Sequence, residues 1–242
     1  MMDSFTFKDY PFEKYFPDET VERNALYVVA TPIGNLEDIS MRALYVLKNA
    51  DMIACEDTRT TSVLLNRYEI SNKLVSYYSH VESRKSALLI EEIKSGKSVA
   101  LVSDSGTPAI SDPGSMFISA CIAEDIKVIP VPGANALIHS LVLSGFDNRK
   151  FFFQGFLPLK GRENVFEYLS GVKMPVIIYE SKFRIKKTLA EIGLYFRGKN
   201  VSVSREMTKV HETTYRNRID ALIKDSGKIK EKGEFVIVID NS

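Results

Sequence analysis

The sequence predicts an α/β protein with two α/β domains, the first built around a mainly parallel sheet. Short apolar runs rich in β-branched residues alternate with segments of helical spacing over residues 25–145. Such alternation indicates βαβ units, because a parallel neighbour strand requires a crossover that is usually a helix. A Gly-containing polar stretch at residues 144–150 then interrupts the alternation. The 242 residues leave room for two domains, which we place at residues 25–146 and 147–242.

The individual elements follow from these patterns in chain order. In the first domain, strands are expected at residues 25–30, 51–55, 74–78, 98–103 and 126–131. Helices are expected between and after them, at residues 41–48, 60–68, 83–93, 116–123 and 136–143. In the second domain, strands of a mixed sheet are expected at residues 151–156, 175–180, 200–205 and 234–240. Residues 1–24 show no consistent period and are interpreted as an N-terminal extension.

Composition is that of a globular protein of a reducing compartment. The chain is 45% hydrophobic and 26% charged, and no stretch approaches the roughly 20 apolar residues of a membrane span. The acidic N-terminus resembles neither a secretory signal nor a transit peptide. Cys55 and Cys121 both stand among apolar neighbours, which is typical of buried small side chains rather than a disulfide. These features predict a cytoplasmic protein.

Charge is distributed unevenly along the chain. The overall net charge is +1, but residues 147–242 carry 19 Lys and Arg against 12 Asp and Glu. Clustered cations gain affinity for a polyanion by releasing its condensed counterions. The second domain is therefore a candidate nucleic-acid surface, and a merely solvated basic face is the alternative.

Loops that follow the strands of the first domain share a content of Gly or Pro beside polar residues. They span residues 31–44, 54–61, 102–115 and 131–136. The loop at 102–115 holds two glycines, two prolines and two carboxylates, so its backbone can approach a ligand closely while acids stand beside it. Ligands of open α/β sheets bind outside the carboxyl ends of the strands. We therefore expect a ligand site formed by these loops.

Several common kinds of site are excluded or weakened by the sequence. Neither G-x-G-x-x-G nor G-x-x-x-x-G-K-[ST] occurs, which argues against Rossmann cofactors and P-loop nucleotides. The three histidines and two cysteines form no H-E-x-x-H or C-x-x-C motif, and no G-x-S-x-G is present. We predict no metal site. Asp57, Asp104 and Asp112 keep a Mg²⁺-dependent phosphoryl-transfer enzyme as an alternative.

Seven motifs together resemble a known family. They are LYVVATPIGNLEDIS from Leu26, EDTRTT from Glu56, ALVSDSGTPAISDPG from Ala100, PVPGANA from Pro130, FQGFLP from Phe153, REMTKVHE from Arg205 and GEFVIVI from Gly233. In this order the motifs are similar to those of the small-subunit ribosomal RNA 2′-O-ribose methyltransferases known as methyltransferase I. That family lies within the tetrapyrrole methylase superfamily of S-adenosylmethionine enzymes.

The resemblance implies S-adenosylmethionine in a cleft between the two domains, a homodimer, and methylation of a cytidine 2′-hydroxyl in the decoding region of 16S ribosomal RNA, free or in the assembled small subunit. The implied cofactor contacts are Pro32, Ile33, Gly34, Asn35, Asp104, Gly106, Thr107, Pro108, Ile110, Ala134, Asn135, Glu180 and Met207. Candidate RNA contacts are Arg59, Lys160, Arg162, Arg184, Arg205 and Lys209. The candidate general bases are Asp57 and Glu56, with Lys209 as a further one.

Alternative functions stay open at this point. A methylase of the same superfamily that acts on a tetrapyrrole or on a protein side chain would also use a basic second domain. A noncatalytic RNA-binding module would need the basic domain but not a Gly-rich cofactor cleft. The chain also departs from the family pattern at Lys182–Phe183, where Pro-His is common.

Overall fold

The computed structural model describes residues 21–79, 82–225, 227 and 229–242. Contacts divide the chain into two compact units, and the boundary between them in the sequence falls between Ala134 and Asn135. The first 20 residues of the expected N-terminal extension lie outside the described part. Among the described residues, every helix is too short or too polar to cross a membrane.

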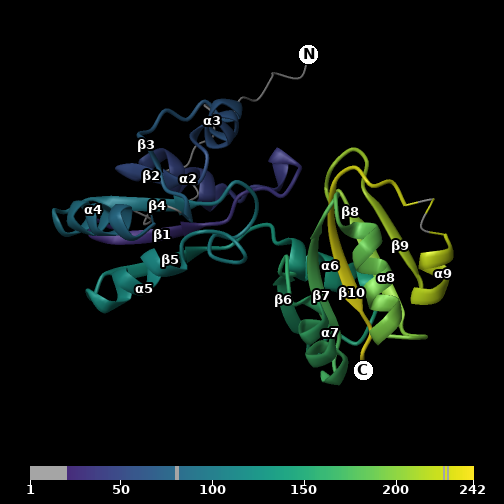
Figure 1. Ribbon diagram of the computed structural model, residues 1–242. Helices are drawn as coiled ribbons and strands as arrows, with labels where there is room; N and C mark the ends of the chain where they lie inside the picture. Colours follow the sequence, from purple (N-terminus) through teal and green to yellow (C-terminus); the bar gives the residue numbers. More distant parts are fainter. Residues whose placement is uncertain (1–20, 80–81, 226, 228) are drawn as a thin grey trace, which may run out of the picture. The chain divides into compact units, whose positions relative to one another are not determined.

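The first unit is a three-layer α/β structure (Figure 1). Its strands are β1 (Ala25–Val29), β2 (Met52–Cys55), β3 (Leu74–Ser76), β4 (Ser98–Val102) and β5 (Lys127–Val131). Its helices are η2 (Leu36–Asp38), α2 (Met41–Asn49), α3 (Thr58–Arg67), α4 (Glu82–Lys94) and α5 (Ser115–Ala123). The sheet has the order β3-β2-β4-β1-β5, and every pairing in it is parallel.

Helices bury both faces of this sheet. Alternate strand residues such as Tyr27 and Ile53 pack with α2 and α3, through Leu44 and Leu64 among others. The intervening residues pack with α4 and α5 on the opposite face, where Phe117 is fully buried. Because both faces are covered, the central strands are continuous apolar runs without polar alternation. Parallel strands point their carboxyl ends at one edge, and this brings the predicted loops together.

The second unit contains a mixed sheet. Its elements are α6 (Ala136–Ser144), β6 (Phe152–Phe156), α7 (Arg162–Gly171), β7 (Val176–Ser181), α8 (Ile185–Tyr195), β8 (Asn200–Arg205), β9 (Thr213–Arg218), α9 (Ile219–Lys224) and β10 (Glu234–Ile239). The strand order is β6-β7-β10-β8-β9, with β6 parallel to β7 and the other pairs antiparallel. Helices α7, α8 and α9 share one apolar core with the sheet.

Helix α6 explains why the units divide earlier than the sequence predicts. The expected domain boundary follows residue 146, whereas the division between compact units precedes α6. Helix α6 packs against β8 and β10, so it covers the face of the second sheet opposite α7 and α8. The sequence predicts the helix but gives no sign of which sheet it covers, because its apolar content suits either one.

Candidate functional site

Two loops of the first unit are joined by an isolated antiparallel β-bridge. The Thr31 N–H donates to the Gly106 carbonyl over 2.9 Å, and the Gly106 N–H donates to the Thr31 carbonyl over 3.1 Å. The Thr31 hydroxyl also donates to the Ser103 carbonyl over 3.1 Å. These bonds hold the loop after β1 against the loop after β4, which are two of the loops predicted to bind a ligand.

Gly106 allows the two loops to approach this closely. Its φ of +85° lies in the region that side-chain-bearing residues disfavour. A Cβ at this position would lie 3.3 Å from Ile33 Cγ2 and 3.8 Å from the Ala134 carbonyl oxygen. The structure therefore brings together three predicted cofactor residues, Ile33, Gly106 and Ala134, from loops that follow three different strands.

A cavity of about 230 Å³ opens at this same edge. It is lined by Thr31, Pro32, Leu36, Thr60, Thr61, Val63, Leu64, Ser103 and Asp104. Pro32 and Asp104 were predicted to bind the cofactor. Apolar walls with one carboxylate and several hydroxyls are typical of sites for small organic ligands. The lining is thus suited to a small organic cation.

The other predicted cofactor residues of these loops occupy varied positions. Gly34 and Asn35 are exposed, and the Asn35 side chain caps η2 by accepting from the Glu37 N–H. Asn135 caps α6 through the Leu137 N–H. Thr107, Pro108 and Ile110 lie in the loop after β4, in which Ala109 and Ser111 have positive φ values of 68° and 65°. Non-glycine residues in that region store backbone strain, which is typical of ligand-binding loops.

Asp57 is held by its neighbour Arg59. Its carboxylate caps α3 through the Arg59 N–H at 2.8 Å and receives two further hydrogen bonds from Arg59 Nε and one from Nη2, the last at 2.6 Å. The side-chain and backbone hydrogen bonds from Arg59 lower the pKa of Asp57 to about 2. Such a weakly basic carboxylate is poorly suited to accept a hydroxyl proton. The structure therefore favours a capping role for Asp57 over the predicted role of general base.

Glu56 and Asp112 have the opposite electrostatic surroundings. Burial and then the nearby Asp104 charge raise the pKa of Glu56. Burial, followed by the charges of Glu56 and Asp104, raises the pKa of Asp112 to about 6. Raised carboxyl pKa values of this kind are typical of proton-transfer groups. Asp112 was not among the predicted catalytic residues, and its place in the Gly-rich loop after β4 was the sequence signal that makes it a candidate.

In the second unit, Glu180 belongs to a buried ionic network. Its carboxylate accepts from Arg184 Nε at 2.8 Å and from the Thr188 hydroxyl at 2.6 Å, and Arg162 Nη1 lies 3.6 Å away. Arg162 also donates to Glu191 and is only 6% exposed. One prediction needs correction here. The Arg162 guanidinium is buried by its partners and is not placed to contact RNA, and the Glu180 carboxylate already accepts hydrogen bonds within the second unit, so a cofactor contact at Glu180 stays a prediction.

The loop after β8 contains further corrections. Arg205 is buried, and it donates to the Lys232 and His211 carbonyls, so it stabilises the loop and is not exposed to RNA. Burial alone would lower the pKa of Lys209, but hydrogen bonds to Glu234 and Glu206 outweigh it and raise this pKa. Lys209 is therefore protonated at neutral pH and unsuited to act as a base.

Three other predicted residues lie at this end of the second sheet. Met207 is buried between Glu206 and Thr208, which have positive φ values of 50° and 65°. Lys160 is exposed in the loop after β6. Arg184 is partly exposed but donates to the Leu157 carbonyl at 2.9 Å.

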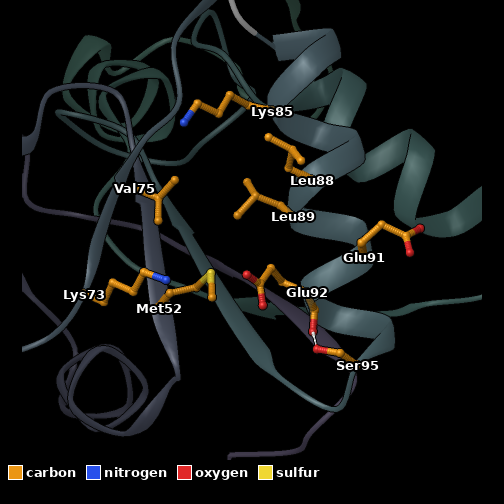
Figure 2. A pocket seen from close by; sticks show the side chains of 9 residues that line it. All are labelled: Met52, Lys73, Val75, Lys85, Leu88, Leu89, Glu91, Glu92 and Ser95. Carbon is orange, nitrogen blue, oxygen red and sulfur yellow. Dashed lines mark hydrogen bonds between the residues drawn. The ribbon is translucent and has the colours of Figure 1, made fainter.

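A larger cavity lies elsewhere on the first unit. It measures about 420 Å³ and lies between α4 and the strands β2 and β3 (Figure 2). The lining residues are Met52, Lys73, Val75, Lys85, Leu88, Leu89, Glu91, Glu92 and Ser95. None of the predicted site residues is among them, and the cavity lies towards the amino ends of the strands, where Met52 begins β2 and Lys73 precedes β3. Despite its smaller volume, the cavity beside Asp104 is therefore the better candidate for the functional site.

The arrangement of Gly-rich loops at the carboxyl edge of a parallel sheet agrees with a family assignment. The sequence profile described as Tetrapyrrole (Corrin/Porphyrin) Methylases matches residues 25–223, which span both units. The chain belongs to the tetrapyrrole methylase family. This confirms the expected fold class of two α/β domains of the tetrapyrrole methylase type. The cleft expected between the domains stays a prediction.

Similar proteins of known name indicate which group within the tetrapyrrole methylase family this chain resembles. A protein of Halalkalibacterium halodurans named ribosomal RNA small subunit methyltransferase I is 43% identical over 223 residues, covering 91% of this chain and 77% of the relative. A protein of the same name from Hydrogenobaculum is 46% identical, covering 88% of this chain and 94% of the relative. The Bacillus subtilis protein of that name is 41% identical, covering 90% and 75%. The resemblance inferred from the motifs is thus confirmed.

Solved structures of tetrapyrrole methylases and related enzymes share the fold. Diphthine synthase superposes with a TM-score of 0.69 at 16% identity, covering 89% of each chain. Uroporphyrin-III C-methyltransferase from Thermus thermophilus, complexed with S-adenosyl homocysteine, gives 0.62 at 17% identity, covering 88% of this chain and 96% of the other. At sequence identities of 16–17%, these structures show that the fold is shared and nothing further.

Proposed function

We propose that this chain is an S-adenosylmethionine-dependent methyltransferase that modifies the ribose 2′-hydroxyl of a cytidine in the 16S RNA of the small ribosomal subunit. The observation that carries the proposal is the identity of 40–46% to proteins named ribosomal RNA small subunit methyltransferase I, over about nine tenths of the chain. This match runs through both units.

The first-unit cavity supports the cofactor proposal. When bound, S-adenosylmethionine supplies an electrophilic methyl group on a positively charged sulfur. Asp104 lines the cavity with a carboxylate, and Leu36, Val63 and Leu64 provide apolar walls. The close approach at Gly106 leaves loop backbone groups at the same edge. Ile33, Gly106 and Ala134 are therefore the backbone contacts that we propose beside Asp104, with the other predicted cofactor residues of the loops around them.

The acids of the same edge support proton removal from the ribose hydroxyl. We propose that one of the two carboxylates, Glu56 or Asp112, accepts this proton, because burial and neighbouring carboxylates raise the pKa of both groups. A general base of this kind contributes about 10²- to 10⁴-fold. Arg59 holds Asp57 in place and is itself exposed, so it remains available as a phosphate contact.

Methyl transfer from labelled S-adenosylmethionine to small ribosomal subunits that lack ribose methylation tests the proposal. The product nucleosides are separated by mass, and 2′-O-methylcytidine is the expected product. Asp104→Asn should weaken cofactor binding by about tenfold or more, since a charge-assisted interaction is lost. Glu91→Gln, an exposed change on α4, is the matched control and should leave cofactor binding unchanged.

Two outcomes would contradict the proposal in different ways. Cofactor binding without labelled RNA would redirect the search to a tetrapyrrole or a protein side chain as substrate. Failure to bind the cofactor at all would remove the methyltransferase proposal itself. A homodimer, a target in the decoding region and a cytoplasmic location are further proposals, which sizing of the purified protein, mapping of the modified nucleotide and cell fractionation would test.

A further inference from the structure

Three loops of the second unit leave its sheet at one edge. Strand β6 is parallel to β7, and β8 runs in the same direction because both β7 and β8 are antiparallel to β10. The loops at residues 157–161, 182–184 and 206–212 therefore leave the same end of the sheet, the first two from the neighbouring strands β6 and β7 and the third from β8, on the other side of β10. We refer to these three loops together as the second-unit edge.

Large apolar side chains protrude from the second-unit edge. Leu159 is 85% exposed, Phe183 is 85% exposed and Val210 is 97% exposed. Single exposed apolar residues are ordinary on protein surfaces, but one in each of three loops at the same end of a sheet is unusual. Removal of an exposed aromatic ring from water is favourable, so the Phe183 ring on its short turn after β7 is a candidate contact for a binding partner.

A positive charge lies beside the exposed ring of Phe183. The Lys182 Nζ atom lies 4.9 Å from the centroid of this ring, within the range of a cation–π contact. Lys160, in the neighbouring loop, is exposed as well. Residues 147–242 as a whole carry a net charge of +7. The expected partner is therefore anionic and also presents a flat apolar surface.

Unpaired nucleotides combine these two properties. Single-stranded RNA stacks its bases on aromatic side chains while Lys and Arg contact the phosphates. A paired base inside a duplex presents no free face for such stacking. A peptide with acidic and aromatic residues would share part of this chemistry, but a phosphate backbone matches the charge of the unit more closely.

We propose that Phe183 is a stacking residue for an unpaired base of the RNA substrate, with Lys182 positioned to contact a phosphate beside that base. The proposal rests on the proposed function and adds to it a position that selects unpaired RNA. Phe183 acts in substrate binding and not in proton transfer. Its loss should therefore raise the KM for RNA and leave cofactor binding unchanged.

The absence of tryptophan from the sequence allows a direct test. Phe183→Trp places a single fluorescent indole at the proposed stacking position. Adding a short single-stranded RNA that carries the target sequence should quench this emission, because the base stacks on the ring. The same RNA annealed to its complement should not quench it. Tyr168→Trp is the matched control, since Tyr168 is a 62% exposed aromatic residue on α7 whose ring contacts Phe152 at the other end of β6.

Substitutions separate stacking from simple apolar contact. Phe183→Leu keeps an apolar side chain but removes the aromatic face, so single-stranded RNA should bind about tenfold or more weakly, as with Phe183→Ala. Phe183→Trp should retain wild-type affinity. Lys182→Gln should reduce the salt dependence of binding by about one counterion. Tyr168→Ala should bind as the wild type does.

The outcomes distinguish this inference from the proposed function. Quenching by unpaired RNA alone, with rescue by tryptophan and not by leucine, supports stacking. Equal quenching by the duplex, or none while the wild type methylates small subunits, overturns the inference and leaves the function standing. Quenching that depends on protein concentration without RNA would instead place Phe183 at a contact between two copies. If the wild type methylates no RNA, the proposed function itself fails.

Discussion

Glu56 and Asp57 are adjacent carboxyl groups with opposite surroundings. Burial raises the pKa of Glu56, whereas hydrogen bonds from Arg59 lower that of Asp57 to about 2. We expect Glu56→Gln to reduce the rate of methyl transfer by about a hundredfold, since it removes a proton acceptor. Asp57→Asn should stay within a few-fold of wild type, because an Asn side chain also caps a helix.

Single-turnover methyl transfer at saturating cofactor measures both rates without contributions from product release. Cofactor affinity, determined in parallel, serves as the control for folding of the site. An Asp57→Asn enzyme as impaired as Glu56→Gln would restore Asp57 as the base.

Asp112 links this site to stability. Burial and two neighbouring carboxylates raise its pKa from 3.8 to about 6, so the folded protein binds this proton more tightly than the unfolded chain. Stability is thereby lost as the pH rises from about 4 to about 6. Asp112→Asn should be more stable than wild type above that window, by on the order of 1 to 2 kcal/mol after allowance for partial exposure.

Urea unfolding at about pH 7.5 and at about pH 4 provides the measurement. The stability difference between Asp112→Asn and wild type should be present at the higher pH and disappear at the lower. Glu91→Gln, on the exposed side of α4, should show no such dependence. A difference that persists in acid would assign the effect to packing.

Individual side-chain roles were the hardest property to predict from sequence. Arg162 and Arg205 follow strands and stand in basic loops, which favours a surface role. In the fold, Arg162 binds Glu191, which lies 29 positions further along the chain, and Arg205 binds two loop carbonyls. Burial of this kind depends on tertiary neighbours and leaves no local signal. Asp57 was similar, since its pKa depends on the rotamer of Arg59.

At the scale of elements, the loop pair at Thr31 and Gly106 provides the next prediction. Gly106→Ala combines an unfavourable φ of +85° with a contact of 3.3 Å to Ile33 Cγ2. We expect a loss of about 1 to 2 kcal/mol in stability together with weaker cofactor binding. Gly96→Ala has a φ of +101° and no heavy atom within 4 Å of the added Cβ, so it should lose stability but keep cofactor affinity.

Chemical denaturation and cofactor titration of the two variants separate these effects. Equal loss of cofactor affinity in both would indicate general destabilisation. Unchanged affinity in Gly106→Ala would remove the loop pair from the proposed site.

Most elements were predictable where the local pattern was strong. The expected helix at residues 41–48 corresponds to α2, and the expected strand at 98–103 to β4. Strand β9 was missed because its residues Thr213–Arg218 are partly or fully exposed, and only Tyr215 among them is strongly apolar. An edge strand of this type is specified by its pairing with β8, a long-range interaction that local periodicity does not reveal.

At the scale of the whole molecule, the division between units predicts which fragments fold. A fragment of residues 135–242 retains α6 and should form a cooperatively unfolding unit. A fragment of residues 147–242 lacks α6 and leaves the faces of β8 and β10 that it covers open to solvent. We expect that shorter fragment to aggregate or to bind hydrophobic dyes.

Thermal unfolding followed by circular dichroism compares the two fragments, and a dye-binding assay detects the exposed surface. If the two fragments were equally stable, the result would support the predicted domain boundary after residue 146. The order of motifs along the chain was sufficient to predict the fold and the family, since most of the motifs lie at or directly after the end of a strand. The motifs were not sufficient to predict the domain boundary, because the sequence of α6 does not indicate which sheet the helix covers.

The reciprocal hydrogen bonds between Thr31 and Gly106 have a kinetic consequence. Each amide proton is held by the carbonyl of the other residue, so neither can exchange with solvent unless both loops separate. The two amides should therefore behave as one opening unit, slower than is usual for loop residues. A ligand that contacts only one of the loops would then slow isotope exchange in both, so occupancy of this edge can be followed at a residue that the ligand does not touch.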